Sequence, residues 1–552
     1  MHIDFSVEGR QRALDRLLAV LFLVGAPLLA HNLYSWMGFN PTDDGFTLAY
    51  SRRILDGQIP HLDFIIIRPF LSPVLHMPVA ALAGDRMLMV SRLVVWFQFA
   101  CIAWIWSRMI NRMLGRPLGS LACFGAAVIC LAFTANVWPI MAWHTVDGLF
   151  LATLGLAICT DDRVRLKAAG YMLLAFAYLC KQSFLFAAPL ALVILGDWRR
   201  PRYWAAIMAP GLAYLLFLLL TGALDDAMIQ FTAHTGLQHI IHRYLSTLTA
   251  GFFLGYLAMR LIHREPAVNL FRNRPKLQAW LGAGLLCALP LYAKLKFLFN
   301  GHPAAMVLEL FWVTAGVASY FVIDGCFSDA GRLAGRVSLL ALLLAFCVSV
   351  SIGASTPTLM GGPIFLILLV NVLKTIGLPS IRTALALVLA GFVAFGWNKS
   401  RHMFVYMEQS AENLTCGLDG VFYGARGVRT NPNTFAFLED LQKAVALARQ
   451  DPWPYAIVPD IPGYWAVSEQ PNPLPIDWAK NTELPTSALL NRVVKSLDAQ
   501  SPRLTVIVQK VEAFPLRFGF KPLLDPEKFA VAHYVRTHAA KCGETEYFEL
   551  YR

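Results

Sequence analysis

The chain has 552 residues, of which 57% are hydrophobic and only 15% charged, and its mean hydropathy is +0.53. Soluble globular proteins average about 25% charged residues, so this composition excludes a disordered chain, a collagen, a coiled coil and a soluble enzyme without membrane spans. The net charge of +12 does not indicate a nucleic-acid partner, because membrane proteins concentrate Lys and Arg in their cytoplasmic loops.

Apolar segments that approach the length of a bilayer crossing recur as far as residue 397. A hydrocarbon core about 30 Å thick needs about 20 apolar residues in a helix. This rule predicts about 13 spans, near residues 17–37, 87–107, 117–137, 141–159, 166–181, 183–197, 203–221, 244–262, 277–298, 304–323, 336–354, 362–378 and 381–397. The first segment lacks an A-x-A-like cleavage site, so we expect a span and not a signal peptide.

The distribution of Lys and Arg predicts the orientation of these spans. Arg10, Arg12 and Arg16 precede the first span. Further clusters fall in alternate loops, at 108–116, 163–167, 199–202, 264–276, 332–336 and 374–382. Because Lys and Arg are retained on the cytoplasmic side, we predict a cytoplasmic N-terminus and, with an odd number of spans, an external C-terminus. The expected location is the plasma membrane, most simply a bacterial inner membrane.

The composition changes after Trp397, and residues 398–552 contain no stretch long enough to span. Asn433 or Thr434 is expected to cap a helix that continues to Leu447. Further elements are predicted as strands at 455–459, 504–509 and 545–552 and as a helix at 485–499. This alternation predicts a small extracytoplasmic α/β domain, residues 398–552, that follows a transmembrane domain, residues 1–397.

The first outer loop, residues 38–85, carries two adjacent carboxylates, Asp43 and Asp44, directly after the first span. Such a pair can supply a general base together with a hydrogen-bond acceptor or metal ligand. The alternative is an ordinary helix start, in which Thr42 or Asp43 caps a helix over 46–55, and spacing alone favours this alternative.

The order of residues in this loop resembles the first outer loop of the GT-C glycosyltransferases, membrane enzymes that use lipid-phosphate sugars. The matching residues are Asp43-Asp44-Gly45, Ala49, Ile54-Leu55, Gly57, Pro60, Asp63-Phe64, Arg68-Pro69 and Pro73. Protein O-mannosyltransferases, the lipid A aminoarabinose transferase and mycobacterial arabinosyltransferases belong to this superfamily. The chain departs from the pattern at His61, where Tyr is commoner, and at Arg68-Pro69-Phe70, where the family has a double proline. The second departure leaves the phosphate contact open.

The resemblance implies a polytopic GT-C-like membrane fold and transfer of a sugar from a polyprenyl-phosphate donor to a glycan, lipid or protein acceptor. Asp43 is then the expected base, with Asp44 as its support or as a ligand of Mg²⁺ or Mn²⁺, and Asp147 is a carboxylate at the acceptor site. The expected cations at the donor phosphate are Arg68, Lys181, Arg243 and His302. Direct attack by the acceptor would invert the anomeric configuration.

Several of these residues have an ordinary structural alternative. Lys181 also suits a helix end from which its ammonium snorkels, and Asp147 also suits a helix cap. Arg68 follows three isoleucines, and a charge without a function would be costly inside a membrane. Arg52 and Arg53 are predicted to line the solvated or headgroup face of an amphipathic helix.

Two other classes of function compete with the glycosyltransferase. A transporter or flippase of lipid-linked saccharides is expected to show inverted repeats and broken helices at mid-membrane, and the sequence has no visible half-chain symmetry. A non-catalytic membrane assembly protein would use its outer domain to bind a partner. Transfer from a lipid-phosphate sugar in vitro would distinguish the enzyme from both.

Two cysteines, Cys416 and Cys542, lie past the last predicted span, each before a glycine. Because disulfides persist outside the cytoplasm, we expect them to form a bond that pins the C-terminal strand to the start of the domain. Two free thiols are the alternative, since a bond requires the Cα atoms to lie within about 7 Å of each other.

Overall fold

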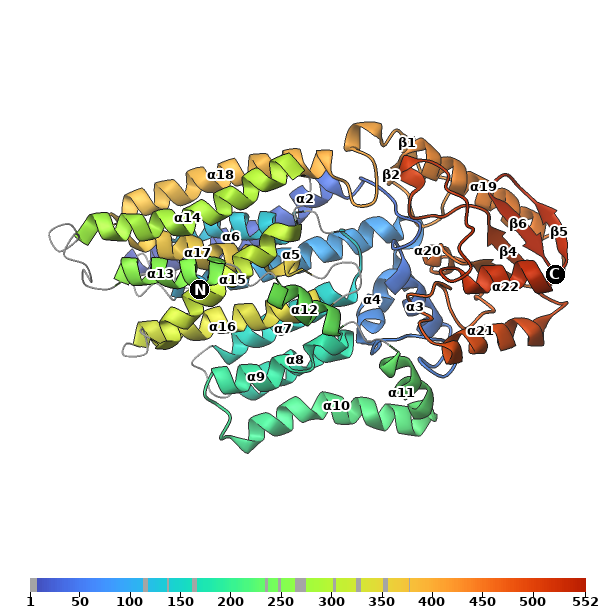
Figure 1. Ribbon diagram of the computed structural model, residues 1–552, viewed down its shortest axis with the longest axis horizontal. Coiled ribbons are helices and arrows are strands. Elements are labelled where there is room, and N and C mark those ends of the chain that lie inside the picture. The colour runs from blue at the N-terminus through green and yellow to red at the C-terminus, as the bar shows by residue number, and fades with distance from the viewer. Residues whose placement is uncertain are drawn as a thin grey trace.

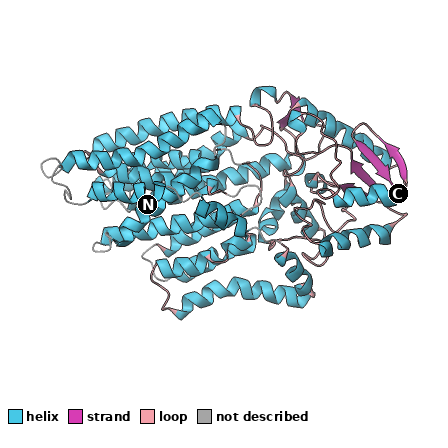
Figure 2. Cartoon of the chain, viewed as in Figure 1, coloured by secondary structure: helices cyan, strands magenta, loops and turns pink. Residues whose placement is uncertain are grey.

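The protein consists of a long helical bundle and a smaller C-terminal domain that contains the β-strands (Figures 1 and 2). The computed structural model describes residues 7–112, 118–136, 139–160, 166–233, 237–246, 250–263, 275–300, 304–323, 329–350, 356–376 and 378–552. Helices predominate throughout, which confirms a mostly helical fold with a small sheet region at the C-terminus.

The bundle is built from helices that coincide with the predicted spans. It begins with α1 (Val7–Val20) and α2 (Ala26–Tyr34), which the π-helical turn η1 (Leu21–Gly25) joins. It continues with α5 (Met87–Arg112), α6 (Ser120–Thr134), α7 (His144–Cys159), α8 (Lys167–Cys180), α9 (Ala187–Ile194), α10 (Pro201–Thr221), α13 (Ala250–His263), α14 (Pro275–Asn300), α15 (Ala304–Ile323), α16 (Asp329–Ser349), α17 (Gly361–Lys374) and α18 (Pro379–Met403).

The number of helices able to cross a bilayer is smaller than predicted. Among the described residues, five helical segments are long and apolar enough: Ala13–Tyr34, Gly84–Arg112, Pro201–Thr221, Gly331–Ser349 and Pro379–Met403. The eight residues of α9 rise only about 12 Å, well short of a hydrocarbon core. The apolar helices therefore indicate membrane association, whereas about 13 spans are not confirmed.

Four further helices lie outside the predicted spans: α3 (Phe46–Leu55), α4 (Leu71–Leu82), α11 (Leu224–Thr232) and α12 (Leu237–Ser246). The predicted helix of the first loop is thus confirmed as α3. His61 fastens this loop to the bundle, because its ring nitrogens contact Gln230 of α11 at 2.8 Å and Tyr214 of α10 at 2.6 Å. The residue that departs from the GT-C pattern therefore positions the loop.

The C-terminal domain has the predicted α/β character. Its helices are α19 (Pro432–Ala448), α20 (Pro462–Trp465), α21 (Ser487–Gln500) and α22 (Ala530–His538). Its strands are β1 (Cys416–Gly417), β2 (Arg429–Thr430), β3 (Tyr455–Val458), β4 (Thr505–Gln509), β5 (Lys541–Glu544) and β6 (Phe548–Tyr551). β1 and β2 form an antiparallel pair, and the other four form a sheet in the order β3-β4-β6-β5, in which β3 and β4 are parallel.

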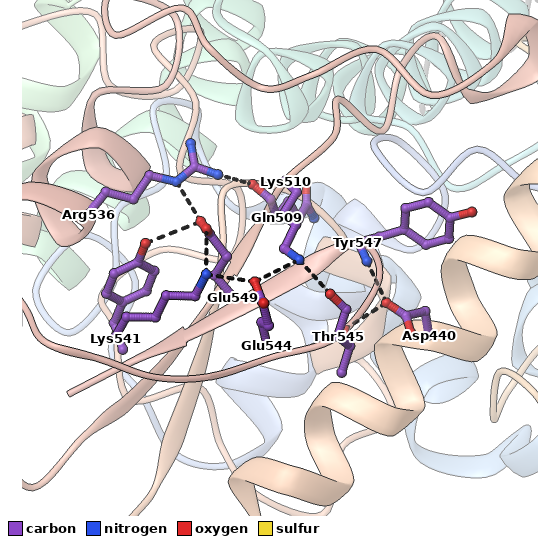
Figure 3. Close-up of polar contacts among 10 residues, drawn as sticks. Asp440, Gln509, Lys510, Arg536, Lys541, Glu544, Thr545, Tyr547 and Glu549 are labelled. Carbon is purple, nitrogen blue, oxygen red and sulfur yellow. Dashed lines mark hydrogen bonds and ion pairs between the residues drawn. The ribbon is translucent and has the colours of Figure 1, made fainter.

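Side-chain contacts correct one detail of the predicted α19 and tie that helix to the sheet. Asn431 is the N-cap, in place of Asn433 or Thr434, and its side chain accepts from both of those backbone N–H groups. Asp440 of α19 accepts hydrogen bonds from Thr545 Oγ1 and Tyr547 N, each at 2.7 Å (Figure 3). The β5–β6 connection is therefore anchored to α19.

The first loop and the C-terminal domain share their hydrophobic cores. The predicted division of the chain into residues 1–397 and 398–552 did not anticipate this. Phe39, Leu48 and Ala49 pack in one cluster with residues of α19 and β6. Ile65 and Ile67 belong to a second cluster with the other face of the sheet, and Ile65 N donates to Pro475 O at 2.7 Å. The isoleucines before Arg68 are thus buried in protein and not in lipid.

The predicted disulfide is wrong. Cys416 and Cys542 are both free, the first partly exposed and the second exposed. Cys416 lies in β1, whose partner strand is β2, whereas Cys542 lies in β5 at the edge of the four-stranded sheet. The two glycine-flanked cysteines therefore belong to different sheets, a separation that their similar local sequences do not reveal.

Candidate active site

The Asp43 carboxylate is a buried hydrogen-bond acceptor and not a helix cap. The N-cap of α3 is Gly45, with φ of +83°, and it makes no side-chain cap bond. Asp43 is 6% exposed, and its Oδ2 accepts from the hydroxyl of Tyr406 at 2.9 Å. Tyr406 follows the end of α18, so the contact joins the two points at which the chain leaves the bundle. The cap alternative for Asp43 is therefore wrong.

Asp44 is held by an arginine of the bundle. Its carboxylate oxygens lie 3.2 and 3.3 Å from Arg92 Nη2 of α5, and its Oδ2 also accepts from Asn40 N at 2.8 Å. Arg92 further donates to the carbonyl oxygens of Ser35 and Gly38, so its guanidinium is enclosed by the end of the first span. Asp44 thus fixes the start of the loop.

The donor set around Asp44 does not fit a divalent metal ion, because a guanidinium already occupies its carboxylate. Across the residues that the structure describes, no group of three or more His, Cys, Asp and Glu side chains is arranged to hold one. The Mg²⁺ or Mn²⁺ requirement stays a prediction, which EDTA treatment of the active protein would test.

The C-terminal domain contributes charges to the aspartate pair. Lys480 Nζ lies 2.8 Å from Asp460 Oδ1 and 3.5 Å from Thr42 Oγ1, and both members of the ion pair are buried. Trp478 Nε1 donates to Asp460 Oδ1 at 2.7 Å. Burial raises the pKa of Asp43 to about 6, whereas the Tyr406 hydrogen bond and the Lys480 charge oppose the rise. The carboxylate is then ionised at neutral pH and remains basic enough to accept a proton.

A narrow recess lies beside Asp44, with a volume of about 20 Å³, roughly the space that one water molecule needs. Its lining includes Asp44, Arg92, Arg401 and Tyr406 together with apolar residues such as Val405. Arg401 Nη1 donates to the carbonyl oxygens of Ala135 and Asn136 at 3.4 and 3.3 Å. The recess thus has polar, cationic and apolar walls.

Arg68 binds a carboxylate of the C-terminal domain. Its Nη1 and Nη2 donate to the two oxygens of Glu483 at 3.1 and 2.9 Å, a bidentate pair in which Glu483 is buried. The guanidinium also lies 5.7 Å from the ring centre of Phe46, which in turn packs on Trp478 and Trp143. The planar fork predicted to hold a phosphate is therefore engaged by Glu483 in this structure.

Lys181 is a buried cation without a carboxylate partner among the described residues. It is 5% exposed, and its Nζ donates to Thr145 Oγ1 at 2.9 Å. The guanidinium of Arg68 lies close enough for its positive charge to act on Lys181. A buried ammonium that has only a neutral hydrogen-bond partner is costly, and such groups in membrane proteins mark ligand sites. The snorkelling alternative is wrong, since the side chain is enclosed.

Asp147 belongs to a buried hydrogen-bond network that shares no partner with Asp43 or Asp44. It is fully buried near the start of α7 and accepts from Ser72 Oγ at 2.5 Å and Gln98 Nε2 at 2.7 Å, with His76 Nε2 at 3.0 Å. These donors come from α4 and α5, so Asp147 joins three helices. Its oxygens are saturated, which argues against the predicted role at the acceptor site.

The remaining predictions concern two proposed phosphate contacts, Arg243 and His302, and two arginines of α3. Arg243 lies on α12, where its neighbour Tyr244 contacts Ser349 of α16 at 2.5 Å, and His302 lies outside the described residues. Arg53 corrects the prediction of a solvated face: it is 4% exposed and forms a bidentate pair with Asp477 at 2.7 and 2.8 Å. Arg52 does face solvent and pairs with Asp56.

Sequence reasoning missed four groups around Asp43: Tyr406, Asp460, Lys480 and the Arg68 partner Glu483. All four follow the last span, and 438 residues separate Lys480 from Thr42. The available signal was the dense polar and aromatic stretch 477–483, Asp-Trp-Ala-Lys-Asn-Thr-Glu, in which three charged residues fall within seven positions. Without a contact across the chain, this stretch is indistinguishable from a solvated loop.

The structure places a buried carboxylate, Asp43, where the first loop meets the C-terminal domain, and a buried amine, Lys181, beside Thr145 just after the end of α8. A carboxylate can accept a proton from a hydroxyl, and a buried cation can stabilise a leaving anion. No known family model matches the chain, and no curated protein sequence matches it.

Proposed function

We propose that the protein is an integral-membrane glycosyltransferase of the GT-C type, which transfers a sugar from a polyprenyl-phosphate donor to an acceptor hydroxyl. The observation that carries the proposal is the buried Asp43, whose pKa of about 6 suits a general base. The order of motifs in the first loop supplies the likeness to that superfamily, and the apolar helices supply a setting for a lipid-linked donor.

In the proposed reaction, the acceptor oxygen attacks the anomeric carbon of the donor while the bond from that carbon to the phosphate oxygen breaks. The hydroxyl proton passes to Asp43, and the bonding electrons leave with the polyprenyl phosphate. Lys181 stabilises the charge that grows on the phosphate, as a preorganised cation in a site that excludes water. Displacement from the opposite face inverts the anomeric centre.

The decisive experiment is transfer in vitro from a synthetic polyprenyl-phosphate sugar by the purified protein in detergent or nanodiscs. Labelled sugar should reach an added acceptor, and free polyprenyl phosphate should accumulate in equal amount. Movement of the intact lipid-linked sugar across vesicles, without cleavage, would instead support the flippase alternative. A reporter after Tyr455 that responds as cytoplasmic would contradict the proposed external reaction.

Lys181→Met should weaken use of the donor. Loss of a charged hydrogen bond to phosphate costs about 1.5–3 kcal/mol, which corresponds to roughly a 10- to 150-fold decrease in kcat/KM for the donor. Lys443→Met, which removes the same charge from an exposed position on α19, is the matched control. An effect confined to the acceptor KM would contradict the placement of Lys181 at the donor phosphate, and Lys181→Arg should restore part of the activity.

The reaction rate should depend on the ionisation of Asp43. Burial raises the pKa of this carboxyl to about 6, and only the ionised form accepts a proton. The rate should therefore fall about tenfold for each pH unit below 6. A kcat/KM profile measured between pH 4.5 and 8.5 tests this expectation, and a flat profile across pH 6 would contradict it.

A further inference from the structure

The large apolar side chains exposed on the C-terminal domain are concentrated in one segment. From residue 404 to 552, which the structure describes without a gap, the exposed ones are Phe404, Tyr423, Leu447, Trp453, Phe514, Phe518, Phe520 and Leu524. Half of them fall within the eleven residues Phe514–Leu524, and Phe518 and Leu524 are 81% and 78% exposed. Single exposed apolar residues need no explanation, but a concentrated set marks an interaction surface.

This segment is fastened to the point at which α18 ends. It contains the short 3₁₀ turn η7 (Leu516–Phe518), and Gln409 Nε2 donates to Arg517 O at 2.9 Å. The residue before Gln409, Glu408, accepts from Phe39 N at 3.2 Å, just past the end of α2. Figure 1 shows the ends of α2 and α18 together beside β1 and β2. The segment Phe514–Leu524 therefore lies level with the exits of both helices.

The helices at this exit face outward from the bundle. Only 22% of the apolar window of Ala13–Tyr34 and 17% of that of Pro379–Met403 is buried in protein. Lipid must cover the remaining apolar surface, and this lipid ends near η7. The exposed Phe side chains stand among cations, since the Arg517 guanidinium lies 4.4 Å from the Phe518 ring centre and Lys521 is exposed. Aromatic and basic residues together are typical of the membrane–water interface.

We propose that the segment Phe514–Leu524 is a membrane-interface anchor that inserts Phe518 and Leu524 among the lipid headgroups of the adjacent leaflet. The anchor gives the C-terminal domain a direct contact with lipid, in addition to its connection through residues 404–410 and the cores that it shares with the first loop. The inference depends on membrane association of the bundle and not on the transfer reaction, so failure of one leaves the other standing.

Fluorescence quenching of the full chain in nanodiscs tests the anchor. A bimane label is attached at Phe518→Cys in a variant whose Cys287, Cys326, Cys416 and Cys542 are replaced by serine. The matched control retains Cys542 alone, which is exposed on the edge strand β5. Lipids that carry a doxyl group near the headgroup should quench the label at 518 and leave the label at 542 unchanged. Leu524→Asp should reduce the quenching at 518.

The same labels distinguish other occupants of the surface. Equal quenching at 518 and 542 by aqueous iodide, with none by doxyl lipid, would show a solvent-exposed loop and overturn the proposal. Protection at 518 from both iodide and doxyl lipid, together with a dimeric mass, would show that a second copy covers the segment and would also overturn it. These outcomes do not require transfer activity.

Discussion

Asp43→Asn is expected to decrease transfer by about 10²–10⁴-fold, the usual effect of removing a general base. The amide keeps the shape of the side chain and can still accept the Tyr406 hydrogen bond, but it cannot take up a proton. The test compares single-turnover rates of the purified parent and variant at saturating donor. A variant with most of the parental rate would show that Asp43 is not the base.

The same variant should be at least as stable as the parent at pH 7 to 8. A carboxyl whose pKa is raised in the folded protein is destabilising above that pKa, because the fold must then hold an ionised group that it disfavours. Asparagine does not ionise, so this cost disappears. Thermal unfolding of both proteins in the same detergent measures the effect, with the exposed Asp56→Asn as a matched control in the same loop.

Gly463→Ala is expected to decrease transfer about 10²-fold, the magnitude associated with a shift of about 1 Å in a catalytic group. A Cβ at Gly463 would overlap the carbonyl oxygen of Asp44, and one at Gly45 would lie 2.5 Å from the Gly463 Cα. The backbone beside the aspartate pair thus packs directly on that of α20. A single methyl group would push the base away from Lys480.

The overlap should also cost about 1–3 kcal/mol of stability, as overpacking usually does. Gly543→Ala provides the control, because a Cβ there meets the Leu550 Cβ at 3.8 Å, an ordinary contact. The measurements are the donor kcat/KM and the unfolding midpoint of each variant. Parental activity in Gly463→Ala would mean that the backbone contact between Asp44 and Gly463 does not position Asp43.

The sequence predicts where helices and strands lie along the chain better than it predicts which elements contact one another. Apolar length locates the bundle helices, and the short β-branched runs locate β3 and β4, because these signals are local. Apolar length cannot tell lipid from protein interior, so Ile65 and Ile67 suggested a membrane around Arg68, although they lie in the core of the C-terminal domain. The helix α9, half of whose residues are buried, is likewise apolar without being long enough to span.

In the candidate site, too, local signals were readable from the sequence and contacts between distant segments were not. Asp43, Asp44 and Lys181 were identifiable from residue type, order and expected side of the membrane. Their surroundings were not, because an ion pair such as Arg68 with Glu483 forms only after two distant segments meet. Arg53 is a residue that the sequence predicted to be solvated and that the structure shows to be buried. Its position on the helix suits a solvated face, but in the fold its guanidinium pairs with Asp477 in the interior.

The shared core of the first loop and the C-terminal domain has a consequence for biosynthesis. Thr42 precedes Lys480 by 438 residues, which a ribosome adds in roughly 20 to 90 s at about 5–20 residues per second. Throughout this interval the isoleucines and phenylalanines of the loop have no partner strands to pack against. A chain that stops before α19 therefore retains its apolar helices but displays an unsatisfied hydrophobic loop, which membrane proteases and chaperones recognise. Formation of this core and assembly of the candidate site therefore wait for the completion of synthesis.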